Sequence, residues 1–143
     1  MLLENKNAII FGAGGSLGAA IGQAFAMAGA SVFLSGLHLN AAENAAAKIR
    51  AAGGVAEARQ VDALSKTEVE AFVSLVSRLY GSVDISFNAI GLEDVQDIPL
   101  TEMSVEDFTR PISRAMQSHF ITGRAGRLIR KYLSTLFPIS DMS

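Results

Sequence analysis

Glycine is concentrated in one short segment, residues 11–18, which reads Phe-Gly-Ala-Gly-Gly-Ser-Leu-Gly. It follows a short apolar run and precedes apolar residues at helical spacing, so it connects a predicted strand to a predicted helix. Glycine permits positive φ and a close approach of ligand to backbone. The following helix N-terminus adds free N–H groups and a positive dipole end, which suit a pyrophosphate. The segment therefore predicts a phosphate-binding loop shaped by Gly12, Gly14, Ser16, Leu17 and Gly18.

The spacing within this loop narrows its interpretation. A strict G-x-G-x-x-G does not fit because Leu17 stands where the third glycine is required, whereas G-x-x-x-S-x-G fits through Gly12, Ser16 and Gly18. A Walker A loop is excluded because no Gly-Lys-Ser/Thr is present. Two alternatives remain: the glycines serve only a tight strand-to-helix turn, and Ser16 is the helix N-cap, a role compatible with phosphate binding.

The elements around the loop alternate between short apolar runs and longer helical patterns. The predicted strands are residues 8–11, 31–35, 55–61 and 83–87. The predicted helices are residues 17–28, 40–52 and 65–79. Asn40 is the expected N-cap of the second helix, and Ser65 with Glu68 forms an expected capping box at the third. This order predicts an α/β fold: a Rossmann-like, doubly wound parallel sheet with helices on both faces, binding its ligand where the strand order reverses.

A further helical stretch begins at Ser104 and contains Pro111. Proline removes a backbone donor and clashes with the preceding turn, so we expect one short helix to Arg110 and a second from Pro111 to about Tyr132. Residues 133–137 are a candidate fifth strand.

Composition limits the class of protein. The chain has 143 residues, of which 50% are hydrophobic and 18% charged, as expected for one folded domain over residues 1–143. Its net charge of −2 gives no electrostatic drive toward nucleic acid. There is no cysteine, and His38 and His119 are far apart in sequence, so no metal site is expected. No apolar stretch reaches membrane-spanning length and the start lacks signal-peptide order, so we expect no membrane partner and a cytoplasmic location.

With these motifs together, the chain resembles the short-chain dehydrogenase/reductase family over about residues 5–131. That family's T-G-x-x-x-G-x-G loop is matched by Gly12 and Gly18, with Phe11 in place of Thr and Ser16 in place of the middle glycine. Its acidic residue after the third strand matches Asp62, and its N-N-A-G motif appears as Asn88-Ala89-Ile90-Gly91.

The resemblance implies roles at two strand ends. Asp62 and Ala63 are implied to border the adenine of an NAD(P) cofactor. Asn88, Ala89 and Ile90 are implied to border the ribose next to the nicotinamide. Each polar residue also has a structural alternative: Asp62 as a turn cap, and Asn88 as a strand-end amide bonded to backbone.

Cofactor choice is expected at the end of the second strand. An acid there would bond the adenosine ribose and repel a 2′-phosphate, but Gly36 occupies its place. An arginine favouring NADP is also missing, since Leu37 follows, and His38 is expected to be an exposed loop residue. Without the repulsive acid, the balance favours NADP.

The resemblance implies hydride transfer with a small carbonyl or alcohol substrate, by a Tyr whose pKa is lowered by a Lys four residues later. Tyr80 and Tyr132 are followed at that spacing by Asp84 and Leu136. The family's relay Asn aligns with Ala115, and Ser140 is the candidate catalytic serine. We therefore expect a C-terminally truncated cofactor-binding portion, inactive alone.

Two other functions stay open. One is a non-catalytic dinucleotide-binding module that regulates a partner. The other is a structural piece in which the helix from Pro111 packs against its copy, as the corresponding helix often does in oligomers of the family. A homo-oligomer is expected.

Overall fold

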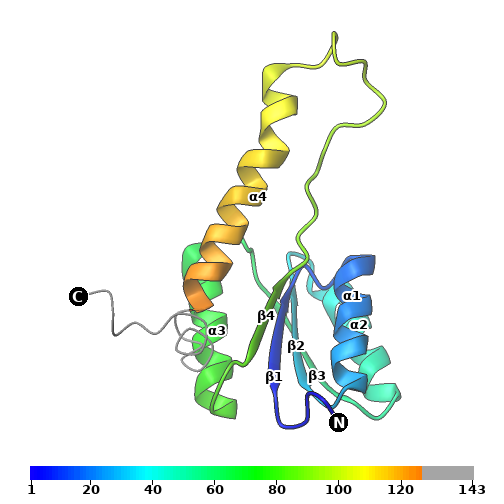
Figure 1. Ribbon diagram of the computed structural model, residues 1–143, viewed down its shortest axis with the longest axis vertical. Coiled ribbons are helices and arrows are strands. Elements are labelled where there is room, and N and C mark those ends of the chain that lie inside the picture. The colour runs from blue at the N-terminus through cyan, green and yellow to red at the C-terminus, as the bar shows by residue number, and fades with distance from the viewer. Residues whose placement is uncertain (127–143) are drawn as a thin grey trace, which may run out of the picture.

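The computed structural model describes residues 1–126, in which strands and helices alternate along the chain (Figure 1). The four strands are β1 (Asn7–Phe11), β2 (Ser31–Gly36), β3 (Val55–Gln60) and β4 (Ile85–Asn88). The helices are α1 (Ser16–Met27), α2 (Leu39–Ala51), α3 (Lys66–Tyr80) and α4 (Val105–Ala125). The predicted strands and first three helices are thus confirmed to within a few residues.

All strand pairs are parallel, in the order β3-β2-β1-β4. The order reverses between β1 and β4, because the chain first builds outward through β2 and β3 and then returns to the other side of β1. Phe11 at the end of β1 pairs with Ser35 of β2 and with Asn88 of β4. The register therefore brings three strand ends, and the loops that follow them, to one edge of the sheet.

Two helices cover each face of the sheet: α1 and α2 lie on one side, α3 and α4 on the other (Figure 1). The predicted doubly wound fold is confirmed. The α1/α2 face is rich in alanine, which allows close packing on Ile10 and Leu34. The α3 face is built from larger side chains, among them Phe11, Phe72 and Val73. Phe11 and Phe72 meet edge to face, with ring centroids 6.0 Å apart.

The N-terminus of α2 differs from the prediction. Asn40 is not its N-cap: α2 begins at Leu39, and His38 is the cap, without a side-chain hydrogen bond. The main chain begins the helix earlier, since Ala42 N already donates to His38 O at 3.5 Å. Burial of Ala42 and of the alanines that follow sets the phase of this helix, and the capping preference of asparagine does not.

The prediction of two helices around Pro111 is wrong. One helix, α4, runs through Pro111, after an N-cap at Ser104 whose hydroxyl accepts from Asp107 N at 3.0 Å. An internal proline costs about 3 kcal/mol through its lost donor and its clash. One stripe of α4 is nevertheless buried, and the packing of this stripe offsets the cost. Its residues are Pro111, Ser118, Thr122 and Ala125.

Several expectations fall on residues that the structure does not describe. The end of the long helix at Tyr132, the fifth strand at residues 133–137 and Ser140 lie outside residues 1–126. Within the described residues, no helix combines the length and the apolar character needed to cross a bilayer.

Candidate functional site

Gly12 lies directly after β1, where the strand order reverses toward β4. Its φ is +79°, a conformation that side-chain-bearing residues rarely adopt. A Cβ built on Gly12 would lie 2.7 Å from the carbonyl carbon of Ala89, the residue after β4. Only glycine lets the loops after β1 and β4 meet here, backbone against backbone.

Gly18 closes the same loop from within α1. A Cβ at this buried position would lie 2.4 Å from Gly12 O and 2.8 Å from the Cα of Ala13. Gly14 faces the neighbouring helix, where a Cβ would lie 2.9 Å from the Cβ of Ala41. The three glycines therefore allow the loop to pack closely against the residue after β4, against α2 and against the first turn of α1.

The loop leaves a group of main-chain amides at the N-terminus of α1. Ala13 N donates to Ser35 O at 2.9 Å and Gly15 N to Gly12 O at 3.3 Å, so these two are used within the fold. The amides of Ser16, Leu17 and Gly18 begin the helix and have no acceptor one turn earlier within it. They are the donors available to an anion.

Gly15, and not Ser16, is the N-cap of α1. The alternative role of Ser16 as the cap is therefore wrong, and its exposed side chain stands on the first helical residue. Leu17 beside it is 60% exposed. Because both side chains are exposed, this turn and its main-chain amides lie at the surface and not in the core.

The end of β2 forms one flank of the site. Gly36 is buried, and a Cβ there would meet nothing closer than Gly14 N at 3.7 Å, which is ordinary contact. Leu37 and His38 are exposed, and Leu37 O accepts from Gln60 Nε2 at 3.1 Å. The first turn of α2 contains no acidic residue. This flank therefore presents neither the acid nor the arginine whose positions the sequence identified.

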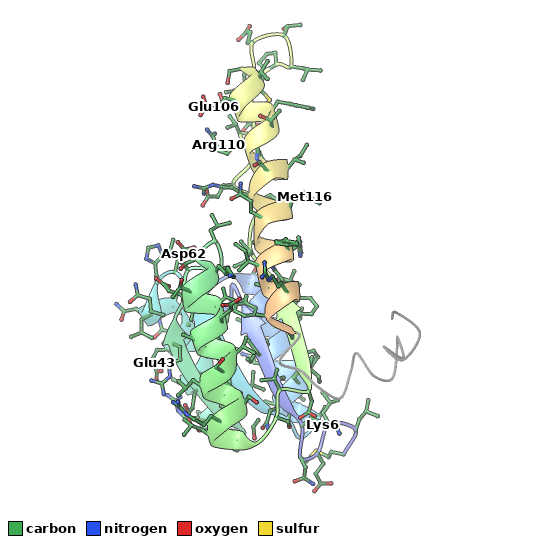
Figure 2. The ribbon with its side chains drawn as sticks, turned by 90° about the vertical axis from the view of Figure 1, so that its left-hand side faces the viewer. Lys6, Glu43, Asp62, Glu106, Arg110 and Met116 are labelled. Carbon is green, nitrogen blue, oxygen red and sulfur yellow. The ribbon has the colours of Figure 1, made fainter. Side chains whose placement is uncertain are left out.

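Asp62 follows β3 at the N-terminal end of α3, at the same edge of the sheet (Figure 2). Its Oδ1 accepts from Leu64 N at 2.9 Å, so the turn-capping role is observed. Ala63 beside it is buried. The turn is tied to β2, because Val61 N donates to Gly36 O at 3.0 Å. Asp62 thus lies on a turn bonded to the end of β2, which is itself bonded to the glycine-rich loop of residues 11–18 through Ala13 N and Ser35 O.

Asn88 turns its side chain toward α4. Its Nδ2 donates to Thr122 Oγ1 at 3.2 Å and to Ser118 Oγ at 3.4 Å, and its Oδ1 accepts from Ile90 N at 3.0 Å. The backbone contact expected of a strand-end amide is therefore present. The adjoining Ala89 N donates to Phe11 O at 2.8 Å. The hydrogen bonds of Asn88 therefore hold in place the backbone after β4 that contacts Gly12.

Sequence reasoning missed Ser118 and Thr122. Both are buried on α4 and share a face at i, i+4 spacing. That spacing was visible in the sequence, but its partner was not, because Asn88 is 30 residues from Ser118 along the chain.

Tyr80 lies away from these strand ends. It ends α3, and its carbonyl accepts from the side chain of Asn7, the first residue of β1. The hydrogen bond between its hydroxyl and Glu57 raises the pKa of Tyr80, with a smaller contribution from burial. Tyr80 therefore stands at the opposite edge of the sheet from Gly12 and is not placed for chemistry there.

A hollow of about 230 Å³ lies elsewhere, between α1 and α2. Its lining includes Met27, Lys48 and Ala52, which belong to the C-terminal parts of these helices. It is remote from the N-terminus of α1 and brings no pair of titratable groups together. No group of three potential metal-ligating side chains occurs in the part of the chain that the structure describes.

Comparison with known proteins identifies the fold's relatives. The sequence profile described as short chain dehydrogenase matches residues 6–128. An uncharacterized oxidoreductase of Bacillus subtilis (strain 168) is 32% identical over 122 residues, which are 85% of this chain and 44% of that protein.

Two solved structures align over most of the chain. A metagenomic short-chain oxidoreductase in complex with NADP has a TM-score of 0.76 and 26% identity, covering 87% of this chain and 56% of the other. An NAD+-bound xylitol dehydrogenase has a TM-score of 0.79 and 26% identity, covering 95% and 51%. The chain spans about half the length of these relatives. With the profile match over most of its length, the chain belongs to the short-chain dehydrogenase family.

Proposed function

We propose that this chain binds an NAD(P) dinucleotide across the carboxyl ends of β1, β2 and β4. One observation carries the proposal: Cβ atoms at Gly12 and Gly18 would lie within 2.7 Å of backbone atoms, beside helix amides that have no partner within α1. Packing of this kind excludes side chains and leaves donors where a pyrophosphate would lie. Relatives of similar fold bind NADP or NAD+.

Each flank then has a defined part. The amides of Ser16, Leu17 and Gly18 would hold the pyrophosphate, and Gly14 would leave room for the adjoining ribose. Asp62 and Ala63 would border the adenine. Ala89 and Ile90 would border the nicotinamide ribose, with Asn88 holding their backbone. The bound cofactor supplies a nicotinamide ring that gains or gives a hydride.

Gly15→Asp tests this assignment with little risk to the fold. Asp is a favoured N-cap and Gly15 has φ of −82°, so we expect the helix to be kept. Its carboxylate would stand against the pyrophosphate, and we expect NADPH affinity to fall by about tenfold or more. Gly15→Asn is the matched control, similar in shape and capping but uncharged. Fluorescence titration with NADPH measures both, and wild-type-like affinity in Gly15→Asp would refute the proposed site.

We further propose that NADP is preferred over NAD. The support is the missing acid at Gly36 and in the first turn of α2. A side chain fits at Gly36, since its Cβ would meet only ordinary contacts. We expect Gly36→Asp to lower the NADPH-to-NADH affinity ratio by about tenfold, and Gly36→Asn to change it much less. An unchanged ratio in Gly36→Asp would contradict the preference.

For the whole protein we propose hydride transfer between the nicotinamide and a carbonyl or alcohol substrate. In the 143 residues, neither Tyr80 nor Tyr132 is followed by Lys four positions later. We therefore expect NADPH binding without turnover from this chain alone, tested by loss of reduced-nicotinamide absorbance with a panel of ketones. Turnover would show that another group acts as the acid. A regulatory module would also bind without turnover.

We also propose that α4 associates with α4 of a second copy. Five apolar side chains at spacings of three or four residues are each more than half exposed on α4. These residues are Val105, Phe108, Ile112, Met116 and Phe120. A contiguous apolar ridge of this kind marks an interaction surface. We expect Met116→Glu to yield a monomer by light scattering, whereas Gln117→Glu, at an exposed position of the same helix off the ridge, leaves the oligomer intact.

A further inference from the structure

The turn that carries Asp62 is held by a carboxylate from α3. Glu68 Oε2 accepts from Asp62 N at 2.7 Å, six residues back along the chain. In an ordinary capping box the acid at this helical position accepts from the N-cap amide, which here belongs to Ser65. Ser65 N instead donates to Asp62 O at 3.0 Å, so that amide is already used. Glu68 reaches past the cap and binds the main chain of Asp62.

The other half of the capping box is present. Ser65 Oγ accepts from Glu68 N at 3.3 Å, which fixes the backbone of Glu68 on the first turn of α3. Glu68 is therefore anchored at its own backbone and holds Asp62 at its side chain. These hydrogen bonds tie the Asp62 turn and the α3 N-terminus into one unit.

The Asp62 carboxylate is oriented by this unit. Its Oδ1 accepts from Leu64 N at 2.9 Å, and within residues 1–126 no hydrogen bond engages Oδ2. With the main chain held by Glu68 and one oxygen held by Leu64, the second oxygen has a set direction. An ionised carboxylate only accepts hydrogen bonds, so the matching ligand group is a donor such as an exocyclic amine.

We infer that Glu68 is a positioning residue that sets the preference of the site for a 6-aminopurine over a 6-oxopurine. The inference rests on the proposed binding of the dinucleotide, in which Asp62 borders the base. Adenine offers an amine at C6, whereas hypoxanthine offers a carbonyl oxygen there and would meet the carboxylate acceptor to acceptor. A rigid Asp62 cannot move to the neighbouring ring N–H of hypoxanthine, but a loosened one can.

The test compares NADPH with its deamino analogue, which carries hypoxanthine in place of adenine. Affinities are measured by fluorescence titration for the wild type, Glu68→Ala, Glu68→Gln and the control Glu70→Ala. Glu70 lies on the same helix and pairs with Lys66 at 3.9 Å, so its removal makes the same charge change without touching Asp62. Urea unfolding of each variant checks that the fold is kept.

We expect the wild type to bind NADPH about tenfold more tightly than the analogue, as a charge-assisted hydrogen bond allows. In Glu68→Ala this ratio falls at least about threefold, mainly because NADPH binds less well. Glu68→Gln restores most of the ratio, since its amide oxygen still accepts from Asp62 N, and Glu70→Ala keeps it.

Two failures are distinguishable. If the wild type binds NADPH and Glu68→Ala keeps the full ratio, Glu68 only caps α3 and the inference is wrong. If the wild type binds neither cofactor, the proposed function itself fails and the inference with it. A general loss of stability in Glu68→Ala that weakens both cofactors equally also overturns a positioning role.

Discussion

The glycine-rich loop of residues 11–18 and the projecting arm are built from contrasting residue types. The arm comprises residues 89–115, the loop after β4 and the first half of α4, and it extends beyond the sheet edge (Figures 1 and 2). At the glycine-rich loop, glycines bring backbone against backbone, and a single Cβ at Gly18 would collide with Gly12 O. Along the arm, Phe108 and Ile112 are more than half exposed.

This contrast shows in which region a substitution should change the stability of the whole chain and in which it should act only locally. The glycine-rich loop packs closely against the residue after β4 and the first turn of α1, so we expect changes at its buried glycines to act on global stability. The arm is held at its base by Asn88, Ser118 and Thr122, and along its length by local contacts such as the Arg114–Glu93 ion pair. Changes in the arm should therefore act locally unless a second copy covers it.

Gly18→Ala is expected to have the largest effect. The added methyl carbon lies 2.4 Å from a backbone oxygen and 2.8 Å from the Cα of Ala13, neither of which can move without shifting β1 or α1. Overpacking of this kind costs about 3 kcal/mol in the free energy of unfolding, measured by urea denaturation. The control in the arm is Gly91→Ala, whose Cβ meets nothing within 4 Å. Equal destabilisation by the two substitutions would break the contrast.

Thr122→Val tests the joint between the two regions. The substitution keeps the shape but removes the hydroxyl that Asn88 Nδ2 contacts at 3.2 Å. A part-buried amide donor that loses this partner should cost about 1–2 kcal/mol of global stability by urea denaturation. Thr109→Val removes an exposed hydroxyl of the same helix, bonded to Val105 O, and serves as the control. A similar loss in Thr109→Val would mean that the joint at Asn88 is not special.

The two serine caps allow a matched comparison between the regions. Ser65 accepts from Glu68 N at 3.3 Å in the sheet-packed part, and Ser104 accepts from Asp107 N at 3.0 Å in the arm. Each Ser→Ala change should cost its helix about 1 kcal/mol. We expect Ser65→Ala to lower the global urea midpoint, and Ser104→Ala to raise amide hydrogen exchange only in the first turns of α4. Global destabilisation by Ser104→Ala would show that the arm folds as one unit with the sheet.

The smallest effect expected is a pH dependence confined to the arm. Hydrogen bonds from Ser104 and then Arg110 lower the pKa of Asp107 below its ordinary value of 3.8. Because the pKa of Asp107 is lower in the folded state than in the unfolded chain, the ionised carboxylate stabilises the helix at pH values above the unfolded-state pKa. This contribution is lost as the pH falls through the folded-state pKa. Hydrogen exchange at the start of α4 should therefore rise, relative to the rest of α4, on acidification below 3.8. Asp107→Asn should remove this pH dependence, and its persistence would assign it to another group.

Much of the fold was predictable because its signals are local. The short apolar runs predict strands, Ser65 caps α3 as expected, and Gly81 with φ of +86° ends it. The glycine-rich loop was visible for the same reason: its glycines are adjacent in sequence, and so is the helix that they open, whereas its binding of a pyrophosphate stays a prediction. These features depend on the conformational preferences of single residues and of their neighbours within a turn.

At each exception, the local preference of a residue is outweighed by packing or hydrogen bonding with other parts of the chain, which the local sequence pattern does not show. Pro111 stays inside α4 because a buried stripe outweighs its cost, and Asn40 loses the cap position because a line of buried alanines sets the phase of α2. The Asn88 contacts join residues 30 or more positions apart.

By itself the sequence determined the order of elements, the parallel sheet and the place of the glycine-rich loop, because these follow from spacing and residue type. Only the tertiary structure decided which polar groups hold the loops after β3 and β4. Glu68 accepts a hydrogen bond from the Asp62 amide and not from that of Ser65, and Asn88 donates to two hydroxyls of α4 and not to solvent. Those choices depend on which donors remain unpaired once the chain has packed, and a list of residues does not specify that.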